Sequence, residues 1–463
     1  MSVLNNFTVS IAKGMRRLRQ SKELCDRGSG LTRKQHGSNE HRLKMQKCLI
    51  VSKVTRYEYE KHSHDNIEDS KLEKILRKRG SDYDAMISTH REQKAFEASV
   101  ARNLKDMGLE VEMASRLTYN EELINWCDVV VPCGGDGTFL LAASRVRDAN
   151  KPVIGFNSAP HKSVGRLCLP TWCSNDVKGA LQALKEGRFT WMRRSRIRTT
   201  ITSEPKLLDT ITPVDLHTLH YCRYPPVTNP HDNPETSKSS NFSTEETNST
   251  LATKVLPFLA LNEVFIGESV TSRVSLLRLQ IDNGQWTHTK SSGLCVTTGT
   301  GSTSWHYSIN CLRTHSVLEL MKILGDEFNV KIDSSLEKAR EVTERYNEKL
   351  MFPADSEHLA YSVREYITFE EWPAPRGLRV RDRAASVRVR SHCSDAGERA
   401  LPTNTHTRTH RAAAVRVRSH CSDAGLVVDG SVSFPFNDGT EALLEIHPED
   451  SLMTVHMDDA LPY

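Results

Sequence analysis

A strand, a glycine-rich turn and a helix follow one another in the first third of this chain. The apolar run Asp128 to Cys133 leads into Gly134-Gly135-Asp136-Gly137-Thr138, and the helix-like stretch Phe139 to Val146 follows directly. This order predicts a buried strand that ends at the first amides of a helix, and such amides bind phosphate groups. The glycines allow the backbone to approach a ligand closely. The segment therefore favours an α/β fold with a phosphate site at the turn.

Asp136 places a carboxylate inside this turn. A carboxylate repels phosphate unless a cation intervenes or a substrate hydroxyl has to lose its proton, so its presence suggests phosphoryl transfer with Asp136 as general base. The alternative is that Asp136 only caps the helix. The chain has no Gly-x-x-x-x-Gly-Lys-Ser/Thr segment, so it is not a P-loop enzyme.

From Cys48 onward, short apolar runs alternate with helix-like stretches. We expect strands at 48–51, 109–113, 129–133 and 152–156, and helices at 70–79 and 87–107. This alternation predicts a parallel sheet covered by helices, a Rossmann-like α/β domain that we assign to residues 43–188. The glycine turn then lies at the carboxyl end of a strand, where open α/β sheets bind ligands.

Beyond Phe189 the pattern is mostly β. We expect strands at 191–192, 197–201, 264–266, 274–281, 294–296 and 426–428, with helices at 316–324 and 334–350 between them. Asp282-Asn283-Gly284 reads as a hairpin turn. These features predict a second, largely β domain over 189–455, followed by a tail at 456–463.

Two tracts interrupt the second domain. Residues 221–254 are rich in Pro, Thr, Ser and Asn, which predicts a disordered surface loop or a regulatory tract with phosphorylation sites. Within 384–425, the segment AASVRVRSHCSDAG at 384–397 recurs at 412–425 with one difference. Two copies are too few for a solenoid, so they indicate a local duplication or a faulty gene model. We expect the second copy to continue into the strand at 426–428.

Histidines and cysteines gather in the duplicated tract and offer an alternative interpretation as a metal site, because His-x-x-x-His occurs at zinc spacing. The paired cysteines of a zinc finger are missing, and the candidate ligands recur only with the duplication, so we predict no metal site there. The candidates are His392, Cys393, His406, His410, His420 and Cys421.

The composition excludes several classes of protein. The 62 basic and 58 acidic residues leave a net charge of +4, and no segment combines clustered Lys and Arg with aromatics, which argues against nucleic-acid binding. No apolar run approaches the roughly 18 residues that span a bilayer, so we expect no membrane insertion. The eleven cysteines form no Cys-x-x-Cys pair, so neither a disulfide scaffold nor a four-thiolate zinc site is indicated.

The amino-terminal segment is basic and amphipathic. Five Lys and Arg residues precede the first acid at Glu23, and apolar residues recur among them at near-helical spacing. This pattern is typical of a mitochondrial transit peptide, and an ordinary basic disordered tail is the alternative. We assign residues 1–42 to this segment and predict a location in the mitochondrial matrix.

Two further segments accompany the glycine turn. They are ALNEVFIGES at 260–269 and TGTGSTSW at 298–305. In this order the three segments resemble the NAD kinases, and the runs at 47–60, 151–170 and 426–439 are most similar to the mitochondrial branch. The resemblance covers most of 47–455. It implies an NAD kinase-like two-domain architecture and a homodimer.

The resemblance also implies the substrates and the site. The protein would bind ATP with Mg²⁺, use NAD as the acceptor, and rely on Asp136 as the catalytic residue. The residues implied in binding are Gly134, Gly135, Gly137, Thr138, Asn157, Asn262, Glu263, Thr300, Gly301, Ser302, Thr303, Ser304, Trp305 and Asp429.

The leading hypothesis is therefore a kinase that transfers phosphate from ATP to the 2′-hydroxyl of the adenosine ribose of NAD and so makes NADP. A lipid kinase of the diacylglycerol or sphingosine type shares the glycine turn and is one alternative. A non-catalytic NAD-binding protein is another.

Overall fold

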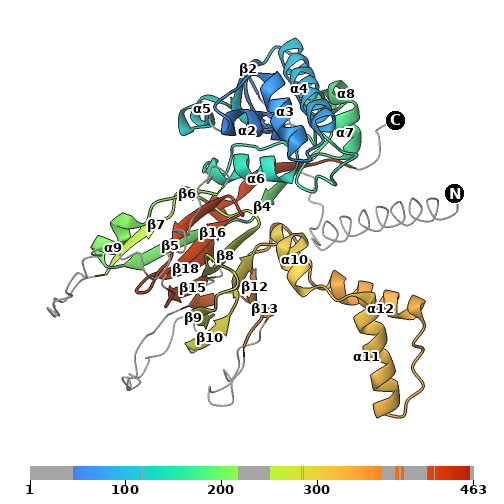
Figure 1. Ribbon diagram of the computed structural model, residues 1–463, viewed down its shortest axis with the longest axis vertical. Helices are drawn as coiled ribbons and strands as arrows, with labels where there is room; N and C mark the ends of the chain where they lie inside the picture. Colours follow the sequence, from blue (N-terminus) through green and yellow to red (C-terminus); the bar gives the residue numbers. More distant parts are fainter. Residues whose placement is uncertain are drawn as a thin grey trace.

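The first domain is a parallel sheet between layers of helices (Figure 1). The computed structural model describes residues 45–116, 118–216, 251–282, 284, 286–367, 381–384, 387–389, 414–421 and 423–458. The sheet has the order β2-β1-β3, and both pairings are parallel. Its strands are β1 (Lys47–Ser52), β2 (Glu110–Ser115) and β3 (Val129–Cys133). The predicted transit peptide lies outside the described residues.

Alternate residues of β1 face two different helix layers, as the two-residue repeat of a strand requires. Cys48 and Ile50 pack with α4 and α8, whereas Leu49 and Val51 pack with α5 and α6. The sheet is therefore buried on both faces at β1 and β3, which explains the apolar runs in these two strands, whereas the edge strand β2 is mostly exposed and carries polar residues. The helices are α2 (Arg56–Ser63), α3 (Asp69–Lys78), α4 (Tyr83–Asp106), α5 (Glu121–Trp126), α6 (Asp136–Arg145), α7 (Thr171–Asn175) and α8 (Val177–Lys185).

The segment expected as a strand at 152–156 runs parallel to β3. Val153 and Phe156 bridge to Val130 and Cys133, and four backbone hydrogen bonds of 2.8–3.0 Å join the segment to β3 and Gly134. The expectation of extended, paired backbone there is confirmed, although the pairing consists of isolated bridges. Its apolar character comes from burial, because Val153, Ile154 and Phe156 lie in the cores of the first domain.

The second domain packs two antiparallel sheets face to face, below the first domain in Figure 1. One sheet has the order β10-β9-β14-β18-β5-β7, with β15 also on β9 and β18, and the other has the order β13-β12-β11-β8-β16-β17-β6. The predicted fold class, an α/β domain followed by a largely β domain, is confirmed. The hairpin expected at 282–284 is also present, because β9 and β10 pair antiparallel.

The strands of this domain are β5 (Ile197–Ser203), β6 (Val214–Asp215), β7 (Ala252–Val255), β8 (Glu263–Glu268), β9 (Ser275–Ile281), β10 (Thr287–Ser291), β11 (Gly293–Thr297), β12 (Leu359–Arg364), β13 (Arg381–Ala384), β14 (Val387–Val389), β15 (Ala414–Ser419), β16 (Ala424–Val428), β17 (Val432–Pro435) and β18 (Glu441–Ile446). The short helices are α9 (Pro205–Thr210), η1 (Gly301–Thr303), α10 (Trp305–Asn310) and η2 (Pro448–Asp450).

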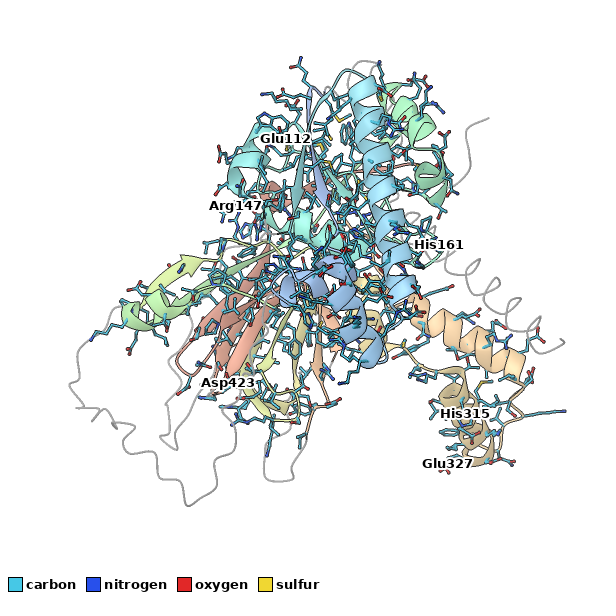
Figure 2. The ribbon with its side chains drawn as sticks, turned by 45° about the horizontal axis from the view of Figure 1, so that its top comes forward. Glu112, Arg147, His161, His315, Glu327 and Asp423 are labelled. Carbon is cyan, nitrogen blue, oxygen red and sulfur yellow. The ribbon has the colours of Figure 1, made fainter. Side chains whose placement is uncertain are left out.

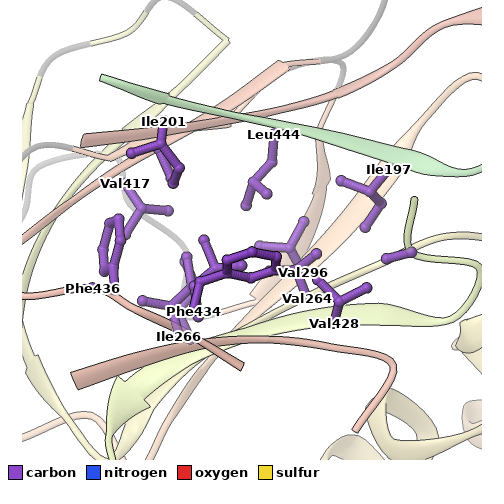
Figure 3. Close-up of a cluster of buried hydrophobic side chains, with 14 of the residues drawn as sticks. Ile197, Ile201, Val264, Ile266, Val296, Val417, Val428, Phe434, Phe436 and Leu444 are labelled. Carbon is purple, nitrogen blue, oxygen red and sulfur yellow. The ribbon is translucent and has the colours of Figure 1, made fainter. Parts of the chain in front are cut away.

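The inner faces of the two sheets form the largest apolar core (Figure 3). Ile197, Ile201 and Leu444 come from one sheet, and Val264 and Phe434 come from the other. Along β5 every second residue is buried, the pattern of a strand with one face on the core. This sandwich holds β8 and β16 rigidly, and both strands lead to the site described below.

The predicted loop at 221–254 needs a correction at its end. Residues 217–250 lie outside the described part of the chain, but Ala252–Val255 is strand β7, which pairs with β5 at the sheet edge. An edge strand obtains its hydrogen bonds from one neighbour and leaves its side chains largely exposed, so it needs no apolar periodicity. Composition alone could not detect it.

The two copies of the duplicated segment pair with the same residues. Val387 of β14 and Val415 of β15 both lie opposite Leu444 of β18 and Ile281 of β9. One edge of a strand can hydrogen-bond only one partner at a given residue, so a single copy can complete this sheet at any time. The second copy leads directly into β16, as expected, because β15 ends at Ser419 and β16 begins at Ala424.

The end of the chain returns to the first domain. Strand β19 (Leu452–His456) pairs with β4 (Thr190–Arg194), and Met457 is buried in a core of the first domain. Trp172 Nε1 donates to the Asp458 carbonyl at 3.0 Å. The start of the predicted tail at 456–463 is thus packed, and residues 459–463 lie outside the described part.

Helices α11 (Thr314–Glu327) and α12 (Leu336–Glu348) form a hairpin that projects from the body of the molecule (Figure 1). They correspond to the two helices expected at 316–324 and 334–350, with slightly different ends. None of the described helices is long and apolar enough to cross a membrane.

Candidate active site

The glycine turn connects β3 to α6 at the carboxyl end of the parallel sheet, as predicted. Gly135 is the N-cap of α6, and Asp136 is the first helical residue. At Gly134 a Cβ atom would lie 2.3 Å from Thr138 Oγ1, so no larger residue fits there. At Gly137 the corresponding space is open. The turn therefore packs closely on one side and leaves backbone accessible on the other, as a phosphate site requires.

The Asp136 carboxylate is held by the loop that follows Phe156. It accepts hydrogen bonds from the backbone amides of Leu167 at 2.8 Å and Arg166 at 3.1 Å. Within the described part of the chain, both of its hydrogen bonds go to this loop and neither goes to an amide of α6. The alternative in which Asp136 only caps α6 thus differs from the structure, although the carboxylate does organise a neighbouring loop. Each of its oxygens accepts one of these two bonds and keeps capacity for a second donor.

Arg166 connects the two domains at this point. Its backbone amide donates to Asp136, and its Nη1 donates to the Thr303 carbonyl at 3.3 Å. The glycine turn and the 298–305 segment are therefore neighbours, although 137 residues separate Arg166 from Thr303 in the chain. Sequence reasoning missed Arg166, because nothing in the 151–170 run distinguishes this arginine from others.

Asn157 lies in the same loop, where its buried side chain is engaged with protein atoms. Its Nδ2 donates to the Ser163 carbonyl at 2.9 Å, and its Oδ1 accepts from the Ala159 amide at 3.1 Å. Ser163 Oγ also bonds Asn157 Oδ1 at 3.2 Å. These contacts shape the loop beside the glycine turn. A direct contact of Asn157 with a ligand remains a prediction.

Asn262 and Glu263 begin β8 and are both buried. Asn262 Nδ2 is 3.4 Å from Ser304 Oγ, which joins this pair to the 298–305 segment. Asn262 Oδ1 and Glu263 Oε2 are buried without a hydrogen-bond partner. Buried polar atoms in folded proteins are nearly always satisfied, so these two oxygens on adjacent residues are candidates for contact with a ligand, and that contact stays a prediction.

The pKa of Glu263 is raised to about 8 by burial and by the nearby Asp429. At neutral pH the side chain is therefore largely protonated and can donate a hydrogen bond as well as accept one.

The 298–305 segment folds as the short helix η1 followed by α10. At Gly301 a Cβ atom would lie 2.2 Å from the Asn262 carbonyl oxygen, so only glycine allows this close approach. Ser302 Oγ donates to the Gly299 carbonyl at 2.6 Å and is fully buried, so this hydroxyl holds the turn itself. Thr303 Oγ1 likewise bonds the Thr300 carbonyl at 3.3 Å. The hydroxyls thus build the turn first, and a role toward phosphates stays a prediction.

Trp305 has protein neighbours on its ring. Its centroid is 4.9 Å from that of Phe265, and the Arg364 guanidinium lies 5.5 Å from the ring. Arg194 Nη1 is 3.4 Å from Thr300 Oγ1 and adds a second cation to this region. Positive charge beside a turn of hydroxyls and amides suits an anionic ligand such as a nucleotide phosphate.

Three predicted segments are therefore brought together around Asp136, Arg166 and Asn262. A family model described as the ATP-NAD kinase N-terminal domain matches residues 16–189. Mitochondrial NAD kinase 2 of Homo sapiens is 34% identical to this chain over 411 residues, which are 88% of this chain and 84% of the human protein. This chain belongs to the NAD kinase family.

A second relative agrees with this assignment. Mitochondrial NAD kinase 2 of Xenopus tropicalis is 33% identical over 434 residues, which are 89% of this chain and 91% of that protein. A crystal structure of yeast NADH kinase complexed with NADH aligns over 90% of this chain and 85% of its own with a TM-score of 0.41 and 12% identity. The protein is thus an enzyme of the NAD kinase family, and the lipid-kinase alternative is disfavoured.

Proposed function

We propose that this NAD kinase transfers the terminal phosphate of ATP to the 2′-hydroxyl of the adenosine ribose of NAD and so makes NADP. The observation that carries the proposal is the contact chain from Asp136 through Arg166 to Thr303. It supports the proposal because the carboxylate lies in the glycine turn, to which we assign phosphate binding, and close to the 298–305 segment, to which we assign dinucleotide binding. A phosphate donor and a hydroxyl acceptor could therefore meet at one carboxylate.

Asp136 takes the proton of the acceptor hydroxyl in this proposal. The amides of Arg166 and Leu167 orient its carboxylate, and free lone pairs remain for the hydroxyl. The backbone of Gly135, Gly137 and Thr138 faces the phosphates at the positive end of α6. Positioning of this kind supplies most of the catalysis in phosphoryl transfer.

Mg²⁺ accompanies the nucleotide in this proposal. Among the residues that the structure describes, no group of three or more His, Cys, Asp or Glu side chains could hold a metal ion. The ion would therefore be bound chiefly by the phosphates of ATP, where it neutralises developing charge.

The test uses the purified chain with NAD, ATP and Mg²⁺, and it measures NADP with an NADP-specific dehydrogenase. Phosphorus NMR of the product distinguishes the 2′-phosphate from other positions. Phosphorylation of diacylglycerol or sphingosine alone would favour the lipid kinase, and NAD binding without turnover would favour the non-catalytic protein. Replacing ATP by inorganic polyphosphate identifies the donor.

A mitochondrial matrix location is part of the proposal. The curated relatives named above are called mitochondrial, and residues 1–22 of this chain contain five basic and no acidic residues. An amphipathic, acid-poor leader of this type is what mitochondrial import recognises.

A homodimer is also part of the proposal, and the α11–α12 hairpin supports it. Val317 and Met321 of α11 pack against residues of α12, but the hairpin also exposes several large apolar residues. Figure 2 shows His315 and Glu327 on this hairpin, well away from the two domains. The exposed residues are Leu320, Ile323, Leu324, Phe328, Val330 and Leu336, which are 45–66% exposed.

We assign this surface to the same hairpin of a second copy, because a two-fold interface is self-complementary and apolar surface gathered in one place marks an interaction site. Ile323→Glu should shift the mass measured by analytical ultracentrifugation from dimer to monomer. Glu341→Lys on α12, where the side chain is 54% exposed, is the control and should leave the mass unchanged. A monomeric parent chain, or an Ile323→Glu dimer, would contradict the assignment.

A further inference from the structure

Asp429 occupies the tight turn between β16 and β17. Both Asp429 and Gly430 have positive φ angles, 47° and 64°, and the Ser431 amide donates to the Val428 carbonyl at 3.0 Å. Two successive positive φ angles are a backbone conformation that Asp and Gly adopt more readily than most residues. The turn therefore holds the Asp429 carboxylate at a fixed position.

This carboxylate is buried against the beginning of β8. Its Oδ2 accepts from the Leu261 amide at 2.8 Å, and its Oδ1 accepts from the amides of Asn262 at 2.8 Å and Glu263 at 3.0 Å. The Asp429 amide in turn donates to the Glu263 carbonyl at 3.0 Å. Four hydrogen bonds therefore fix the backbone from which Asn262 and Glu263 project.

We propose that Asp429 is a positioning residue for dinucleotide recognition, which acts through the backbone of 261–263 and does not itself contact the ligand. The resemblance to NAD kinases had implied direct cofactor binding by Asp429, but its two oxygens already serve three amides. The proposal rests on the proposed function, because it takes NAD as the ligand of Asn262 and Glu263.

The charges around this site support a positioning role. Burial raises the pKa of Asp429 to about 6, and the three amides and the buried Arg196 oppose that rise. Asp429 is therefore mostly ionised at neutral pH, whereas Glu263 beside it is mostly protonated. The other ionisable group close to Glu263 is the Cys295 thiol, whose pKa is raised by burial. At neutral pH the two neighbouring acids therefore carry a single negative charge. This charge is on Asp429, which accepts the hydrogen bonds of the three amides.

Asp429→Asn tests the proposal with almost no change of shape. The new NH₂ group must face at least one of the three amide donors, so one or two charge-assisted bonds are lost and the segment loosens. We expect the Kd for NAD, measured by calorimetry without ATP, to rise about 10- to 100-fold, the equivalent of one or two such bonds. The KM for ATP and the kcat at saturating NAD should change less than about threefold, because the glycine turn is not touched.

Two further readouts separate positioning from general stability. Removing the negative charge at Asp429 lowers the pKa of Glu263, so the pH at which NAD affinity changes should move downward in Asp429→Asn. Amide hydrogen exchange in a peptide covering 261–263 should also accelerate in the variant without any ligand. A uniform loss of stability would not move this pH, and it would accelerate exchange in all core peptides, whereas a positioning role predicts acceleration mainly at 261–263.

Asp438→Asn is the matched control. Asp438 precedes β18, its side chain is 62% exposed, and it pairs with His420. The same chemical change there should leave NAD affinity and the exchange at 261–263 unchanged. If Asp429→Asn does not fold, Asp429→Glu keeps the charge but displaces the carboxylate, and it should weaken NAD binding without altering ATP use.

Unchanged NAD affinity in a folded Asp429→Asn or Asp429→Glu protein would overturn the proposal, as would equal losses for NAD and ATP. If the parent chain itself binds no NAD, the proposed function fails. The hydrogen-exchange result still reports whether Asp429 orders the segment, so the two failures are distinguishable.

Discussion

Replacing Arg196 by Met should destabilise the protein strongly, because this fully buried residue holds the end of α6. Its guanidinium donates to the carbonyls of Ala143 at 2.9 Å and Val146 at 2.5 Å, at the carboxyl end of that helix. Nε donates to the Asp450 carbonyl at 2.5 Å. Burial lowers the pKa of Arg196 to about 10, so it stays charged at neutral pH. A cation there also complements the negative end of the helix dipole.

The magnitude follows from the groups left behind. Met fills similar volume but removes one donor from each of three carbonyls, at about 1 kcal/mol or more for those left unpaired; the Ala143 carbonyl keeps the Val146 amide as a donor at 3.3 Å. The substitution also removes a positive charge that stabilises the ionised form of the buried Asp429 carboxylate. Met also avoids the cost of burying a charged guanidinium, which offsets part of this loss. Removing one partner of a buried pair of opposite charges lowers the free energy of unfolding by about 3–5 kcal/mol in total. At about 2–4 °C per kcal/mol, Tm should fall by roughly 6–20 °C.

Thermal and urea unfolding of Arg196→Met are the assays, and Arg198→Met is the control on the same strand. The Arg198 side chain is 26% exposed and pairs with the carboxylates of Asp450 and Glu449. A partly exposed ion pair of this kind is worth about 0–1 kcal/mol, so Tm should change little in the control. Equal effects of the two substitutions, or a stabilised Arg196→Met protein, would refute the reasoning that Arg196 secures α6.

Four other predictions follow from the same description. Asp136→Asn should lower kcat about 10²–10⁴-fold with NAD affinity within a few fold; equal loss of affinity and stability would show that the carboxylate only holds its loop. Deleting 384–411 leaves Ala412 where Ala384 stood and one strand for the β9–β18 position, so activity and Tm should stay or rise, and a variant that fails to fold or shows zinc-dependent stability would contradict this. Residues 1–42 should carry a fluorescent reporter into mitochondria and be dispensable for folding; a cytosolic reporter would remove the claim. Because the folded pKa of Glu263 is about 8 against an ordinary 4.5, the folded state holds more protons between these values and the free energy of unfolding should fall as pH rises through that window; urea titrations of Glu263→Gln should show a flatter dependence, and an unchanged slope would count against the assignment.

Much of the architecture followed from local pattern. The predicted strand at 129–133 has the bounds of β3, and the helix after the glycine turn was expected from its apolar repeat. These features are readable because a buried strand and an amphipathic helix impose short periods on neighbouring residues. The order of the three segments was also sufficient to identify the family, which the comparisons confirm.

The sequence by itself thus determined the fold class, the family and the segments that build the site. Only the tertiary structure showed that Arg166 bridges the domains, that Arg196 secures α6, and that Asp429 serves three amides. These contacts join residues far apart in the chain, 168 positions in the case of Leu261 and Asp429, so no local period records them. A buried arginine or aspartate looks like any exposed one in the sequence, because its partners are backbone groups that every residue carries. Those roles are therefore set by which backbone the fold brings next to each side chain.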